Sequence, residues 1–303
     1  MLLRNLERKL SKTGKQLEKA GVQTPKTHSD SYVTERVLEM DAVPEVTRVG
    51  KQYTHVSALI GVCPRRHIIS HIHGLERVKA VSPSMRLVWA LGRAAEHHVR
   101  TQFIEAVNKF GVIGIWACKC GYLKSTGLYS EVVAECPRCR SKNSTYKESP
   151  LFDHEARITG SPDMMYMRPD NQKIRVVECK SINKAEFEKL KAPKKDHIHQ
   201  AMAYNELLRI NGLSQDDSVT IIYVCKDFQF KSPYHEFHVE RSEEHEKVIS
   251  LMWQNANLIA KAIRDKAEDK EVVVPDRLVS CSSTSSTTAK SCDCVGACFA
   301  MNN

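Results

Sequence analysis

The chain has 303 residues, of which 42% are hydrophobic and 27% are charged, and its formal net charge is +9. This composition is ordinary for a globular protein with a substantial core, and it excludes a peptide or a tail. No apolar run approaches the roughly 20 residues that a membrane span needs, and Arg4 interrupts the start before a signal peptide can form. We therefore expect a cytoplasmic protein with no membrane partner, whose positive charge favours polyanions or simply serves solubility.

Residues 1–50 predict a basic N-terminal helix followed by a linker. Leucines at partly helical spacing are surrounded by arginines and lysines within the first 30 residues, and Pro25 falls in the polar stretch that follows. Packing of this helix on the main body is the simpler interpretation. A DNA-binding arm is the alternative.

Two helices are predicted between residues 51 and 112. Ser57 is expected to cap a short packed helix that leads to Cys63. Ser82-Pro83-Ser84 predicts the start of a longer helix, because a cap residue and a first-turn proline precede an apolar stripe. The stripe consists of Val88, Leu91, Ala95, Val99 and Phe103. Gly92 and Glu96 share another face of the same helix, one turn apart.

Eleven cysteines in a chain without a secretion signal indicate metal or cluster ligation instead of disulfides. Cys118-Lys-Cys120 and Cys136-Pro-Arg-Cys139 resemble the two knuckles of a zinc ribbon, in which four thiolates hold a module too small to bury a core. The first pair departs from that pattern, since knuckles usually have two intervening residues. We predict a zinc-ribbon-like insertion over residues 113–148, whose aromatic and basic side chains contact nucleic acid or form a polar surface: Tyr122, Lys124, Tyr129, Arg138, Arg140 and Lys142.

A β-hairpin carrying two carboxylates follows the insertion. The turn chemistry around Asp170 and Asn171 predicts that the flanking segments pair as antiparallel strands. With these two residues as the loop, Asp163 lies directly across from Glu178, with Cβ atoms roughly 5 Å apart. Lys180 shares the face of Glu178, because side chains alternate along a strand. Two carboxylates and an amine on one patch suit a hard divalent cation and a phosphate.

The C-terminal half alternates helices and strands. Residues 181–195 form a lysine-rich connection that either binds a nucleic-acid backbone or is solvated loop charge. Asp196 is expected to cap a helix that ends at Asn211-Gly212 and carries Gln200 and Tyr204 on one face. Strands are predicted over residues 218–225 and 234–239. A long helix over residues 243–266 is expected to bury Val248, Leu251, Met252, Leu258 and Ile259.

These motifs resemble a known superfamily. Asp163, fourteen variable residues and Glu178-x-Lys180 resemble the signature of the PD-(D/E)xK nucleases, although an Asp with a Glu-x-Lys alone also occurs on solvated hairpins. Gln200-x-x-x-Tyr204 is similar to the RecB-like branch, which includes recombination helicase-nucleases, CRISPR-adaptation nucleases and single-strand exonucleases. The resemblance implies an α/β fold with a restriction-endonuclease-like core, in which helices flank a mixed central sheet and the zinc-ribbon-like module is inserted.

The resemblance also implies a metal site for phosphodiester hydrolysis. Asp163 and Glu178, with Glu96 and the Cys179 carbonyl, would bind Mg²⁺ or Mn²⁺, and Lys180 would orient or help deprotonate water. In the family, a helix carries Gly-x-x-x followed by a His or Glu that completes the metal site. Glu96 occupies this position after Gly92, and His97, which lies one residue beyond it, is the second candidate for the role.

Gln200 and Tyr204 would act with this catalytic group by positioning the strand near the scissile bond. These two roles also follow from the resemblance alone.

An iron-sulfur cluster is implied by the cysteines at the two ends of the chain. Cys63 resembles the upstream ligand of the iron-sulfur RecB-like nucleases, and Cys292 and Cys298 match their terminal spacing. Cys281 would be the fourth ligand of a [4Fe-4S] cluster, although it is farther from Cys292 than is usual, and Cys294 is a spare candidate. Zinc in the same ligands is the alternative.

We therefore expect a metal-dependent DNA exonuclease that acts on single strands or ends in replication, recombination or repair. A CRISPR-adaptation-like trimming nuclease and a non-catalytic DNA-binding module are the alternatives. No Gly-x-x-x-x-Gly-Lys-Ser/Thr loop occurs, so a helicase would have to be a separate partner, as would a recombination or replication protein. The expected segments are 1–50, 51–112, the insertion 113–148, the nuclease core 149–275 and a cysteine cluster over 276–303 that packs near Cys63.

Overall fold

The computed structural model describes residues 45–47, 53–61, 63–74, 77–79, 82–106, 111–128, 135–142, 144–227, 232–290 and 292–301. The helix and linker predicted over residues 1–50 lie outside the described residues except for 45–47, and so does Tyr129 of the inserted module. The chain divides into two compact units, residues 1–46 with 78–87 and residues 47–77 with 88–303. None of the helices in the described part combines the length and the apolar character needed to cross a bilayer.

The described part of the chain contains both helices and strands, and strands β4 to β10 follow one another without an intervening helix. The helices are α3 (Val56–Leu59), α4 (Pro64–Ile72), α5 (Pro83–Ala106), α6 (Lys184–Lys189), α7 (Lys195–Ile210), α8 (Glu243–Ala267), α9 (Thr287–Lys290) and α10 (Val295–Ala300). The strands are β1 (Glu45–Thr47), β2 (Thr54–His55), β3 (Arg77–Lys79), β4 (Val112–Cys118), β5 (Leu123–Leu128), β6 (Ser144–Lys147), β7 (Leu151–Asp153), β8 (Ile158–Gly160), β9 (Met164–Met167), β10 (Ile174–Ile182), β11 (Ser218–Cys225) and β12 (Tyr234–Glu240).

A seven-stranded sheet with the order β12-β11-β10-β9-β4-β5, in which β6 also pairs with β4, forms the centre of the larger unit. Strands β10 and β11 run parallel, whereas the other pairs of this sheet are antiparallel. Strands β2, β8 and β7 form a separate three-stranded sheet, and β1 pairs with β3. The parallel pair is possible because α6 and α7 lie between β10 and β11 in the chain and provide the crossover that parallel strands require.

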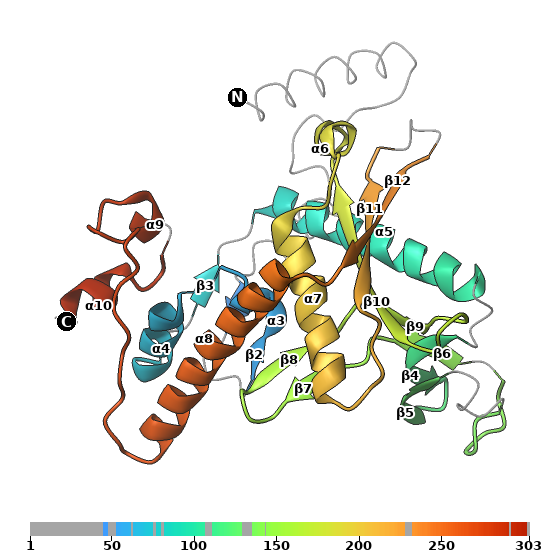
Figure 1. The fold of residues 1–303 in the computed structure, drawn as a ribbon, viewed down its shortest axis with the longest axis horizontal. Helices are drawn as coiled ribbons and strands as arrows, with labels where there is room; N and C mark the ends of the chain where they lie inside the picture. The colour runs from blue at the N-terminus through green and yellow to red at the C-terminus, as the bar shows by residue number, and fades with distance from the viewer. Residues whose placement is uncertain are drawn as a thin grey trace, which may run out of the picture. The chain divides into compact units, whose positions relative to one another are not determined.

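Helices cover both faces of the central sheet (Figure 1). On one face, Val176 of β10 and Ile221 of β11 belong to a core that also contains Leu207 of α7 and Met252 of α8. On the other face, Val177 and its neighbours pack against Val99, Ala95 and Phe103 of α5. This arrangement confirms the expected fold class, an α/β protein with a mixed central sheet flanked by helices.

The cysteine-bearing insertion is continuous with the central sheet. Strand β4 pairs with β9 at one end, through Val112 and Ile113, and Cys118 is its last residue. The same strand pairs with β5 and β6, so the predicted module over residues 113–148 shares a strand with the core. Its position is therefore fixed by ladder hydrogen bonds to the sheet that carries Asp163 and Glu178.

Two helix starts differ from the sequence prediction. The cap of α3 is His55, whose side chain accepts a hydrogen bond from the Ser57 backbone, so the prediction of Ser57 as the cap is wrong. Helix α7 begins at Lys195 with Lys194 as its cap residue, so Asp196 lies in the first turn instead of capping it. The predicted end of α7 at Asn211-Gly212 is confirmed, with Gly212 at φ +71°. The lysine-rich connection holds α6, capped by the side chain of Asn183.

The buried faces of two long helices also differ from the predicted stripes. Val88 and Leu91 of α5 are 42% and 53% exposed, because the helix packs from Gly92 onward. Leu251 and Leu258 of α8 are exposed as well. The buried face of α8 does not include the predicted leucines. Half of its residues are alanines: the face consists of Ile249, Met252, Ala256, Ile259, Ala260 and Ala262.

Candidate active site and metal centres

The hairpin of β9 and β10 places Asp163 beside Glu178. The ladder pairs Val176 with Met165 and ends at Val177 with Met164, and one further step of this register would set Glu178 opposite Asp163. The Asp163 carboxylate accepts a hydrogen bond of 2.7 Å from the Cys179 backbone N–H. This register is the one that a loop centred on Asp170 and Asn171 predicts.

Glu178 is a buried carboxylate with one oxygen unsatisfied. The residue is 1% exposed, and its Oε1 lies 2.5 Å from the Lys180 amine. Its Oε2 is buried and has no hydrogen-bond partner among the described residues. Burial, followed by the Asp163 charge, raises the pKa of Glu178 to about 8. An unpaired buried oxygen costs free energy, so a bound cation or water would stabilise this atom.

The pKa values of Asp163 and Lys180 reflect the same concentration of charge. Burial raises the pKa of Asp163, although the Cys179 N–H and the Lys180 charge oppose this effect. Burial acts to lower the pKa of Lys180, but the neighbouring Glu178 carboxylate outweighs it and raises the pKa. Three ionisable groups therefore share a space that holds more negative than positive charge when both carboxylates are ionised.

Helix α5 contributes Glu96 to this group. Gly92, one turn earlier, lies against β10, because a Cβ at this position would be 2.9 Å from the Ser181 hydroxyl oxygen. Burial and then the Asp163 charge raise the pKa of Glu96, so its carboxylate lies within electrostatic reach of the hairpin. His97 is exposed, and its Nδ1 lies 3.5 Å from the Arg100 guanidinium.

Glu148 and Arg100 form an ion pair beside the site that carried no sequence signal. The Glu148 charge contributes to the raised pKa values of Asp163 and Glu96, and the Arg100 charge opposes it at Asp163. Neither residue belongs to a motif. Their proximity to Asp163 results from the packing of α5 over the segment between β6 and β7.

Helix α7 presents Gln200 and Tyr204 to the same face of β10 as Glu178. The Gln200 side chain donates a hydrogen bond of 2.9 Å to the Tyr204 hydroxyl. Burial and then the Glu178 charge raise the pKa of Tyr204. Gly160, three residues before Asp163, leaves room for this ring, because a Cβ there would lie 2.5 Å from Tyr204 Cε1.

The donor chemistry of the site suits a divalent cation, although the carboxylate oxygens of Asp163, Glu178 and Glu96 do not all lie within 4.8 Å of one another. Carboxylate oxygens of Asp163, Glu178 and Glu96 are the hard ligands that Mg²⁺ and Mn²⁺ take. The unsatisfied Glu178 Oε2 and the raised pKa values of all three groups describe a site that a cation would stabilise. These residues come from β10, the residue preceding β9, and α5, so the fold brings together side chains that are far apart in sequence.

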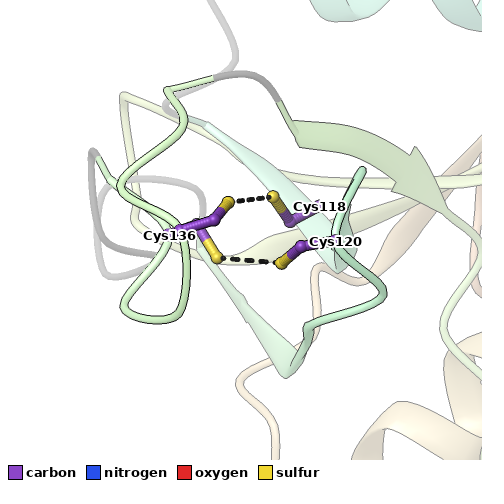
Figure 2. Close-up of side chains that lie close together, drawn as sticks. Cys118, Cys120 and Cys136 are labelled. Carbon is purple, nitrogen blue, oxygen red and sulfur yellow. Dashed lines mark hydrogen bonds between the residues drawn. The ribbon is translucent and has the colours of Figure 1, made fainter.

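A second group of donors lies at the outer end of β4. The Sγ atoms of Cys118, Cys120, Cys136 and Cys139 all lie within 4.8 Å of one another. The Cys118–Cys139 and Cys120–Cys136 sulfur separations are 3.4 Å and 3.6 Å, and Figure 2 shows Cys118 and Cys120 turned toward Cys136. Tetrahedral zinc with Zn–S bonds of about 2.3 Å requires sulfurs about 3.8 Å apart, so this group fits a zinc ion.

Hydrogen bonds lower the pKa of the Cys136 thiol. Burial acts to raise its pKa, but hydrogen bonds from the backbone of Cys139 and Arg138 and from neighbouring thiols lower it to about 7. A thiol that ionises near neutral pH favours metal binding, because the thiolate is the ligand.

A cavity of about 410 Å³ brings together the cysteines of the two ends of the chain. Cys63, Cys281, Cys292 and Cys298 line it, together with Arg65, Arg66, His67 and Arg277. Burial raises the pKa of Cys63, which the Arg66 backbone N–H opposes, and the other three thiols raise it further. The tail therefore lies beside Cys63, with all four sulfurs close enough to interact.

Helix α4 holds the tail by side-chain hydrogen bonds. Arg65 is 3% exposed and donates to the Cys298 sulfur at 3.2 Å and to the Pro275 carbonyl at 2.7 Å. Arg66 forms an ion pair with Asp293. Cys294 does not line the cavity, since its sulfur lies 2.7 Å from the Ser70 hydroxyl on α4. The geometry therefore favours Cys281 over the spare candidate Cys294.

Comparisons with known proteins give a limited result. No protein-family model and no curated protein matches the chain. Among solved structures, the crystal structure of an alkaline exonuclease from Laribacter hongkongensis has a TM-score of 0.41 and 15% identity over 78% of this chain and 99% of the exonuclease. Its complex with dAMP has a TM-score of 0.40 and 15% identity over 78% and 98% of the two chains. Similarity at this level is weak and assigns no function to this chain.

Proposed function

We propose that this protein is a metal-dependent DNA nuclease of the PD-(D/E)xK superfamily, acting as an exonuclease on single strands or ends. The observation that carries the proposal is the group formed by Asp163, Glu178 and Lys180, in which a buried carboxylate oxygen of Glu178 has no partner among the described residues. A purely structural ion pair would satisfy both oxygens, because orphaned buried acceptors are rare. A net charge of +9 is consistent with a nucleic-acid substrate.

Asp163, Glu178 and Glu96, with the Cys179 carbonyl, are the residues that would hold Mg²⁺ or Mn²⁺. When bound, the cation supplies an activated water and stabilises charge on the transferring phosphorus. Lys180 would orient that water or neutralise the negative charge that develops on the phosphate, since its amine is already held at Glu178. Gln200 and Tyr204, linked by a hydrogen bond on the adjacent helix, would position the strand.

The two cysteine groups would hold different metals. The close sulfurs of Cys118, Cys120, Cys136 and Cys139 support a structural zinc ion. The four thiols around the 410 Å³ cavity support a [4Fe-4S] cluster, because within the described residues only the first group has all its sulfurs within 4.8 Å. A single zinc ion bound at the cavity would require its four sulfurs to lie as close together as those of the first group. A separate helicase, recombination or replication protein is a proposed partner.

The decisive experiment compares the wild-type protein with Lys180→Ala on DNA labelled at the 5′ or the 3′ end, single-stranded and duplex, in Mg²⁺ and in EDTA. We expect Mg²⁺-dependent release of short products by the wild type and a loss of rate of about 10²-fold or more in the variant. Lys247→Ala, at an exposed position of α8, is the matched control and should retain wild-type activity. Folded wild-type protein that binds DNA without cleaving it would contradict the proposal and favour a DNA-binding module. Iron and zinc content of the same anaerobic preparation test the two metal assignments.

A further inference from the structure

His197 lies beside the candidate lysine but has no role in the site described above. It occupies the first turn of α7, on the helix face that also carries Gln200 and Tyr204 at spacings of three and seven residues. Its ring is half-buried, and its Nδ1 lies 2.7 Å from the Tyr223 hydroxyl. The imidazole is therefore held in place by a strand of the central sheet.

The strand register brings this pair next to Lys180. Tyr223 of β11 is the direct partner of Lys180 on the parallel neighbour β10, so their side chains leave the sheet on the same face. Tyr223 is fully buried, whereas Lys180 is partly exposed. The hydroxyl of Tyr223 thus holds His197 within electrostatic reach of Lys180.

The hydrogen bonds of Tyr223 favour one tautomer of His197. The Lys194 backbone N–H donates to the Tyr223 oxygen at 2.9 Å, which leaves the hydroxyl proton to be donated to Nδ1 of His197. A neutral imidazole whose Nδ1 accepts carries its hydrogen on Nε2. Burial, followed by the Lys180 and Lys194 charges, lowers the pKa of His197 to about 4, so the ring is neutral at pH 7.

The Nε2–H is a donor without a partner among the described residues. His197 Nε2 donates to neither of the nearby acceptor groups: the Tyr204 hydroxyl accepts from Gln200, and Glu178 is buried with its Oε1 at Lys180. A neutral donor also adds no positive charge that would compete with a cation for the carboxylates. A phosphate oxygen drawn toward Lys180 is the acceptor whose chemistry fits.

We propose that His197 is a DNA-positioning residue of this site, donating a hydrogen bond from Nε2 to a phosphate oxygen of the bound strand, with Tyr223 fixing the tautomer that makes this possible. The inference rests on the proposed nuclease function and names a residue that recognises its substrate. The proposal predicts that DNA binding depends on the position of the N–H group, and not only on the presence of a ring.

The test uses three substitutions with different donor positions in the full-length protein. The amide of His197→Gln reaches the position of Nε2, the amide of His197→Asn reaches only that of Nδ1, and His197→Ala has no donor. With a single-stranded oligonucleotide in Mg²⁺, we expect KM to rise at least about tenfold for the Ala and Asn variants and kcat to change much less, since a hydrogen bond to a charged group is lost. The Gln variant should recover most of the loss.

A second measurement separates this role from a structural one. Nitrogen-15 NMR of the histidine ring in metal-free protein should show hydrogen on Nε2 in the wild type and a mixture of tautomers in Tyr223→Phe. Unchanged KM in folded His197→Ala, equal defects in the Gln and Ala variants, or hydrogen on Nδ1 in the wild type would each overturn the inference. A wild-type protein that neither binds nor cleaves DNA would instead refute the proposed function, while the NMR result would still decide the tautomer.

Discussion

Replacing Glu178 by glutamine should stabilise the metal-free protein at alkaline pH. Glu178 is 1% exposed, and burial followed by the Asp163 charge raises its pKa from the ordinary 4.5 to about 8. Glutamine keeps the shape of the side chain and removes the charge. A residue that binds metal is therefore expected to cost stability when the metal is absent.

The size and sign of the effect follow from proton linkage. A carboxyl with a raised folded-state pKa binds more protons in the folded than in the unfolded chain, so its contribution to stability falls as pH rises from about 4.5 to about 8. At about 1.36 kcal/mol per pH unit, the full cost of the charge is roughly 5 kcal/mol. Water admitted beside the partly exposed Lys180 reduces this cost, so we expect Glu178→Gln to gain about 2–4 kcal/mol at pH 9 and almost nothing at pH 4.5.

Urea unfolding in EDTA at a series of pH values measures this gain. Glu188→Gln, at an exposed position of α6, is the matched control and should change the unfolding free energy by less than about 0.5 kcal/mol. Addition of Mg²⁺ should stabilise the wild type and leave the Glu178 variant almost unchanged. If Glu178→Gln is no more stable than the wild type at pH 9, the carboxylate is not under the strain inferred here and the argument for a cation at this site fails.

Three further predictions concern the metals and the packing beneath the site. Binding of Mg²⁺ should release protons below pH 8, because Glu178 must ionise to bind the cation. Calorimetric titration in buffers of different ionisation enthalpy measures this proton release. Binding enthalpies that do not depend on the buffer would contradict the prediction. Gly160→Ala should lower the unfolding free energy by about 1–3 kcal/mol, because its Cβ would lie 2.5 Å from the Tyr204 ring; unchanged urea unfolding would show that the ring can move aside. Cys298→Ser should lose iron from anaerobically purified protein whereas Cys294→Ser should retain it, since of these two cysteines only Cys298 lines the cavity. Iron loss in Cys294→Ser but not in Cys298→Ser would exchange their roles, and equal loss would contradict the choice between them.

The sequence by itself determined the hairpin and its chemistry. Strands β9 and β10 are neighbours in the chain, so the turn at Asp170 and Asn171 and the alternation of side chains suffice to set Asp163 across from Glu178. The pairing of Gln200 with Tyr204 follows in the same way from one turn of helix. These features depend on contacts close in sequence, which local geometry fixes.

Only the tertiary structure decided which surfaces pack and which distant residues meet. Leu91 and Leu258 have the spacing of core residues but are exposed, because the sides of α5 and α8 that meet the core are chosen by their partners. Likewise, β4 joins the central sheet through β9, so the insertion is tied to the core in a way that cysteine spacing does not reveal.

The contacts of His197 with Tyr223 and of Arg100 with Glu148 were equally hidden in the sequence. They join elements that are separated in the chain, and their formation depends on how α5 and α7 pack against the sheet. Sequence patterns specify the periodicity of each element, whereas the rotation and position of each element are set by packing against all the others, which no single stretch of sequence encodes.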